Sequence, residues 1–69
     1  METLQNLKQL LQSNSIVELS NENDVFEVTF SKVRSHFVLR KNGMVTMTSK
    51  TLKRVEMGLP SDLEVTDLF

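Results

Sequence analysis

The chain has 69 residues, a formal net charge of −1 and no cysteine. Typical domains hold about 100–200 residues, so this length predicts one small domain spanning residues 1–69. One histidine and no cysteine exclude a disulfide framework, a thiolate zinc site and the common catalytic metal sites, so we expect no metal and no cofactor. No apolar run approaches the length of a membrane span or a signal-peptide core, so we expect no membrane contact and a cytoplasmic protein.

Motifs of common enzymes are missing from the sequence. Its only glycines are Gly43 and Gly58, which excludes a glycine-rich phosphate loop, and it holds neither a nucleophile elbow nor an HExxH motif. His36 is the one side chain that titrates near neutrality, and no predicted neighbour completes a catalytic group around it. We therefore expect a protein that is not an enzyme.

The N-terminal segment has the spacing of an amphipathic helix. Leucines recur at steps of three and four residues at Leu4, Leu7, Leu10 and Leu11, which predicts a helix over residues 2–13. Its other face is rich in glutamine and carries few charges. We expect this helix to pack its leucines on a sheet.

From Ser15 the period changes to two, which is typical of strands with one apolar face. Alternation predicts strands around residues 15–20, 25–31, 36–40 and 44–48, joined by polar turns. If the apolar side chains of neighbouring strands share one face of the sheet, Leu19 pairs with Phe26 and Val28 pairs with Leu39. We expect the core face of the sheet to carry nine apolar side chains: Val17, Leu19, Phe26, Val28, Phe30, Phe37, Leu39, Val45 and Met47.

The segment from Lys41 to Gly43 allows two turn geometries. A two-residue Asn-Gly turn would pair Lys41 with Met44 and place Val45 on the face opposite Leu39. A three-residue loop with Gly43 in the left-handed conformation instead pairs Leu39 with Val45 and keeps the apolar side chains together. We therefore predict the three-residue loop.

After Thr48 the apolar spacing becomes helical again. Ser49 is the expected N-cap, and Gly58 with Pro60 ends the pattern, so we predict a second helix over residues 50–57. The tail, residues 61–69, fits either a strand or a short helical turn, and we favour a helical turn or an irregular segment. The predicted class is α+β, with an N-terminal helix, a four-stranded antiparallel meander sheet and a short second helix, both helices on one face of the sheet.

Charge is distributed in three blocks. Residues 32–54 hold seven basic residues and no acidic one, whereas all nine acidic residues lie before or after this segment. A basic segment can bind phosphates, so its members are candidate nucleic-acid contacts, chiefly the three at the start of the second helix. These candidates are Lys50, Lys53 and Arg54, aided by Lys32, Arg34, Arg40 and Lys41.

The order of helix, strands and helix, with the sequence from Ser49 to Arg54 opening the last helix, resembles a double-stranded RNA-binding domain. That resemblance implies contact between the start of the second helix and phosphates. Members of this family have three strands, a long second helix and usually a basic total charge, and the present chain differs from them on each of these points.

The outward face of the predicted sheet carries few charges. His36, Val38 and Met44 are expected to share this face, and we interpret them as a candidate surface for a protein partner. The small core makes a homodimer plausible on size alone. The sequence thus favours a non-enzymatic binding or regulatory module that contacts another protein or its own copy, with nucleic-acid binding as the alternative.

Overall fold

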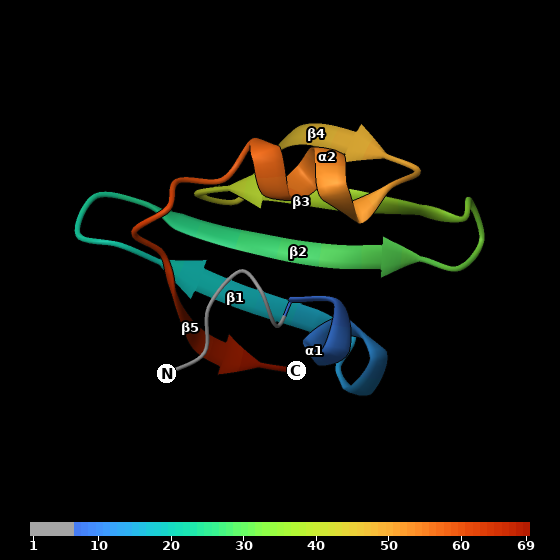
Figure 1. Ribbon diagram of the computed structural model, residues 1–69, viewed down its shortest axis with the longest axis horizontal. Helices are drawn as coiled ribbons and strands as arrows, with labels where there is room; N and C mark the ends of the chain where they lie inside the picture. The colour runs from blue at the N-terminus through green and yellow to red at the C-terminus, as the bar shows by residue number, and fades with distance from the viewer. Residues whose placement is uncertain (1–6) are drawn as a thin grey trace.

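The computed structural model describes residues 7–69 and shows an α+β protein. Figure 1 shows its layers: a twisted antiparallel sheet with two short helices on the near side. The elements, in chain order, are α1 (Leu7–Ser13), β1 (Ile16–Ser20), β2 (Val25–Ser31), β3 (His36–Lys41), β4 (Met44–Ser49), α2 (Leu52–Met57) and β5 (Glu64–Leu68). The strands lie in the order β4-β3-β2-β1-β5, so β2 is the central strand.

The predicted register of the first three strands is confirmed. Leu19 pairs with Phe26 across β1 and β2, and Val28 pairs with Leu39 across β2 and β3. Glu27 lies opposite Arg40 on the other face, as the alternation predicts. The apolar pairs and the charged pair lie on opposite faces because successive side chains of a strand alternate between the two faces of the sheet.

The prediction for the turn between β3 and β4 is wrong. Lys41 pairs with Met44, so Asn42 and Gly43 form a two-residue turn with φ values of 52° and 87°. The register then shifts between Leu39 and Arg40, where Thr46 is the extra residue of a β-bulge. The bulge brings Met47 opposite Leu39, and the apolar face continues without the longer loop.

The tail is also different from the prediction. Residues of the C-terminal segment form a fifth strand, β5, which pairs antiparallel with β1. Val65 pairs with Leu19 and Leu68 pairs with Val17. The sheet therefore has five strands instead of four, and β1 becomes an interior strand.

The second helix of the structure is shorter than predicted, and the first can be compared only from Leu7 onward. The part of the first predicted helix before Leu7, with Leu4, lies outside the described residues. The second begins at Leu52, with Thr51 at the N-cap position, although Thr51 makes no capping hydrogen bond through its side chain. Ser49, the expected N-cap, accepts a hydrogen bond from the backbone N–H of Thr51 at 3.1 Å. In residues 7–69 no helix has the length and apolar content that crossing a membrane requires.

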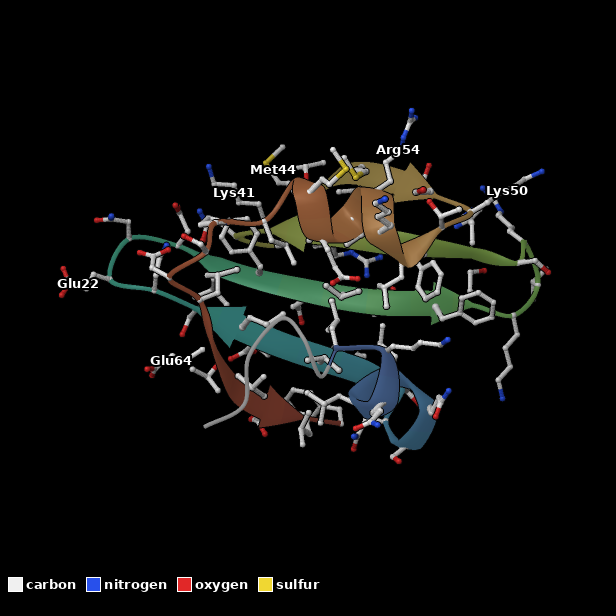
Figure 2. All side chains as sticks on the ribbon, viewed as in Figure 1. Glu22, Lys41, Met44, Lys50, Arg54 and Glu64 are labelled. Atoms are coloured by element: carbon white, nitrogen blue, oxygen red, sulfur yellow. The ribbon has the colours of Figure 1, made fainter. Side chains whose placement is uncertain are left out.

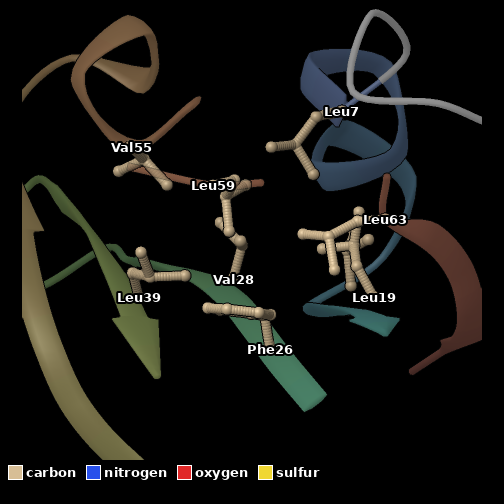
Figure 3. Close-up of a cluster of buried hydrophobic side chains, with 9 residues drawn as sticks. Leu7, Leu19, Phe26, Val28, Leu39, Val55, Leu59 and Leu63 are labelled. Atoms are coloured by element: carbon tan, nitrogen blue, oxygen red, sulfur yellow. The ribbon is translucent and has the colours of Figure 1, made fainter. Parts of the chain in front are cut away.

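The core lies between the sheet and the two helices. Figure 3 shows most of its side chains: Leu7 reaches the sheet from α1 and Val55 from α2, while Leu59 and Leu63 come from the segment before β5. Five of the nine predicted sheet residues are buried, namely Val17, Leu19, Phe26, Val28 and Leu39. Phe37 and Met47 are partly buried, whereas Phe30 is 41% exposed and Val45 is 54% exposed. Val45 is exposed because the two-residue turn places it opposite Arg40, on the face away from the helices.

Candidate protein-binding surface

The face of the sheet opposite the helices has no described element over it. Leu7 and Val55 belong to one core cluster with Val17 and Leu39, so both helices pack on the same face. The other face, here called the open face, carries the side chains that alternate with this core.

An uncharged row of side chains crosses the open face. The register places Ile16 opposite Thr29, Thr29 opposite Val38, and Val38 opposite Thr48. Phe69 extends this row, because its N–H donates to Ile16 at 2.9 Å and its carbonyl accepts from Ile16 at 3.3 Å. Neighbouring strands are about 4.8 Å apart, so the row runs for about 19 Å across all five strands.

The adjoining row on the open face is charged. It runs from Asp67 through Glu18 and Glu27 to Arg40 on four neighbouring strands. Thr66 donates its hydroxyl to Glu18 Oε1 at 3.2 Å. Glu18 and Glu27 lie directly opposite each other, an arrangement of like charges that costs stability in an isolated sheet. The open face thus combines an uncharged row with a row that holds both acidic and basic side chains.

The structure separates the three residues expected to form a partner surface. His36 and Val38 lie on the open face, as predicted. Met44 pairs with Lys41 and so belongs to the helix-side face, at the edge of the sheet, where it is 74% exposed (Figure 2). His36 pairs with Ser31, and its buried Nδ1 atom forms no hydrogen bond within residues 7–69.

Part of the basic segment gathers at one end of the sheet. Lys32 and Arg34 lie in the turn between β2 and β3, and both are exposed. Lys50 follows β4 directly, and the pairing of Phe37 with Ser49 places it at the same end. Figure 2 shows Lys50 at this end and Glu22 and Glu64 at the other.

The remaining basic candidates lie elsewhere. Lys53 and Arg54 are exposed on α2, and Figure 2 shows Arg54 directed away from the sheet. Arg40 lies on the open face beside Glu27. Lys41 is at the acidic end, where its Nζ is 4.0 Å from Asp24 Oδ2 in the one ion pair found among the described residues. The seven candidates therefore do not form one continuous patch.

Sequence reasoning missed two members of the uncharged row, Ile16 and Phe69. The outward position of Ile16 already follows from alternation with Val17, and assigning the tail to a strand would have added Phe69, since Leu63 and Val65 show the required alternation. Pairing with β1 is a tertiary contact, and two readings of the tail fitted the local pattern equally well.

Comparison with known proteins adds no relative, since the chain matches no protein-family model, no curated protein and no solved structure. The five strands and the six-residue α2 also differ from the three strands and long second helix of a double-stranded RNA-binding domain.

Proposed function

We propose that this protein is a non-enzymatic binding module that acts by contacting another protein or a second copy of itself. The observation that supports this most is the uncharged row on the open face, which includes Ile16, Val38 and the 58% exposed Phe69. Apolar side chains grouped on an uncovered sheet face are typical of interaction surfaces. The charged row beside them supplies groups that can fix the orientation of a partner.

A matched pair of variants tests this proposal. Val38→Glu places a charge in the middle of the uncharged row, whereas Val33→Glu places the same charge in the turn after β2, where Val33 is 96% exposed. We expect Val38→Glu to lower the mass measured by light scattering, or to abolish capture of a purified partner, while Val33→Glu changes neither. A chain that stays monomeric up to millimolar concentration and captures the same proteins in all three forms contradicts the proposal.

A second candidate function, nucleic-acid binding, is favoured by the exposure of Lys50, Lys53 and Arg54. Arg40 and Lys41 support it less, because each lies beside a carboxylate of the same chain. Binding through this segment predicts an affinity that falls steeply with salt, by about one unit of log-log slope for each phosphate contact. Titration of labelled protein with short RNA and DNA duplexes at low and high salt tests it, and Lys53→Glu with Arg54→Glu must then abolish the shifts.

A further inference from the structure

A groove lies between the two helices, on the face of the sheet opposite the open face. Its floor is formed by Phe30 and Phe37, whose rings are 4.9 Å apart and tilted by 57°. Leu11 of α1 and Leu52 of α2 form the walls. The groove has a volume of about 350 Å³, which lies in the size range of small binding sites.

The groove exists because the described helical segments leave part of the sheet uncovered. α2 has only six residues, and the described part of α1 runs from Leu7 to Ser13. Phe30 and Phe37 are the core-face residues nearest the turn between β2 and β3, where neither helix closes over them. Phe30 consequently remains 41% exposed, although its position in the strand pattern is a core position.

Among residues 7–69, the charged side chains that line this groove are basic. Lys8 and Lys32 are exposed at its rim, together with Gln12, and no carboxylate of the described residues belongs to the lining. An adjoining depression of about 450 Å³ shares Lys32 and Phe30 and continues along Ser13, Asn14 and Ser15. The hydroxyl and amide groups there can hydrogen-bond to a peptide backbone. The site therefore joins an aromatic floor, a cationic rim and an uncharged polar extension.

We propose that this groove binds an acidic peptide segment of a partner protein, which packs one large apolar side chain against the exposed surface of Phe30 and Phe37. The apolar anchor removes the exposed aromatic surface from water, and interfaces concentrate binding energy at such anchors. Carboxylates beside the anchor meet Lys8 and Lys32, which steer an acidic segment and repel a basic one. The size of the groove fits one or two side chains, so an extended segment suits it better than a folded surface.

This site is independent of the open face, because the sheet separates the two. A ligand in the groove contacts Phe30 and Phe37 from the helix side, whereas Val38 projects from the other side. Val38→Glu should therefore leave peptide binding unchanged. A variant that loses partner contact at the open face can therefore still be tested for peptide binding in the groove, and the reverse also holds.

Three blocked pentapeptides provide the direct test. The first has one central Phe flanked by two Glu on each side, the second has Lys in place of Glu, and the third has Ala in place of the central Phe. We expect the first peptide to shift the amide and side-chain signals of Phe30, Phe37 and Leu52 in NMR titrations at low salt. The second and third peptides should bind at least about tenfold more weakly, since one lacks charge complementarity and the other lacks the anchor.

Charge reversal at the rim sharpens this test. The double variant Lys8→Glu with Lys32→Glu should lose the acidic peptide and acquire a preference for the basic one, because both side chains are exposed and can be changed without disturbing the core. Lys53→Glu is the matched control, since Lys53 is an exposed lysine of α2 that does not line the groove. Unchanged preference in the double variant overturns the proposal, as do equal affinities for all three peptides or shifts confined to residues outside the groove.

Discussion

Thr46 determines which residue of β4 packs beside Leu39. The two-residue turn already places Val45 outward beside Arg40, and the extra residue of the bulge then shifts the strand by one position, so that Met47 lies opposite Leu39 beside the core. The Thr46 hydroxyl donates to the carbonyl of Leu39 at 3.4 Å. The turn thus sets the exposure of Val45, and the single unpaired residue sets the burial of Met47.

Replacing Leu39 or Val45 by alanine tests which of the two residues belongs to the core. Leu39 is 2% exposed, so Leu39→Ala should lower the free energy of unfolding by about 2–5 kcal/mol. Val45 is 54% exposed, so Val45→Ala should change it by no more than about 0.5 kcal/mol. Urea denaturation followed by circular dichroism gives both values. Comparable losses in the two variants would show that Val45 lies opposite Leu39 in the core, as a three-residue loop would place it.

Asn42 connects the turn between β3 and β4 to the start of β2. Its side-chain oxygen accepts from the N–H of Val25 at 3.0 Å, and its side-chain amide donates to Asp24 at 3.0 Å. Asn42 also adopts a φ of 52°, which asparagine tolerates better than most residues. The residue therefore serves the turn through both its backbone and its side chain.

Replacement by glycine separates these two contributions. Asn42→Gly keeps the positive φ accessible but removes both side-chain hydrogen bonds, so it should lower the free energy of unfolding by about 1 kcal/mol. Thermal and urea unfolding measure this loss. If the variant is as stable as the original protein, the two hydrogen bonds contribute nothing and the asparagine acts through its backbone alone.

Among the elements, β5 has the greatest effect on the architecture. It covers the edge of β1, leaving β4 and β5 as the two edge strands. The charges Glu64 and Asp67 on β5 discourage further strand addition at that edge, whereas β4 has no charged residue. The two edges of the sheet therefore differ in how open they are to another strand.

Hydrogen exchange tests the pairing of β5. The N–H of Ile16 donates to Phe69, so its exchange in the intact chain should be slowed by at least about tenfold relative to an unstructured amide. Deletion of residues 65–69 should remove this protection at Ile16 while Val28, in the central strand, stays protected. Rapid exchange at Ile16 in the intact protein would favour the irregular tail expected from the sequence.

At the scale of the whole molecule, the fold separates charge along its long axis. The acidic turn after β1 meets the acidic segment before β5, where Asn21 donates to Asp62 at 3.1 Å. Glu22, Asp62 and Glu64 line one depression at this end. The basic residues around the β2–β3 turn gather at the opposite end, beside the groove between the helices.

Crowding of like charges at each end predicts a response to salt. Raising the ionic strength from 0.01 M to 0.15 M shortens the screening length from about 30 Å to about 8 Å, so repulsion within each end weakens. We expect the free energy of unfolding to rise by about 0.2–1 kcal/mol over this range. Lys32→Glu lowers the repulsion at the basic end and should reduce the rise. A fall in stability with added salt would show that attraction between the two ends outweighs repulsion within them.

The residue pattern by itself determined the elements with strong periodicity. Alternation in residues 16–41 fixed the register of β1, β2 and β3, because a shift of one residue would expose Leu19 or Val28. The same alternation predicted the wrong loop at Asn42 and Gly43. Counting alternate positions along two strands cannot detect a bulge, because a bulge adds one unpaired residue to one of them. Local pattern also predicted the α+β class and the helices on one face of the sheet.

The surfaces that carry the proposals depended on tertiary structure. Predicted as core residues, Phe30 and Phe37 became the floor of a groove, because how far a short helix covers a sheet depends on packing and not on local sequence. Lys8 and Lys32 are distant in the chain and meet only when α1 docks beside β2. The pairing of β5 with β1 likewise extends the uncharged row to Phe69. Periodicity specifies which face of an element is apolar, whereas long-range packing decides how much of that face is covered.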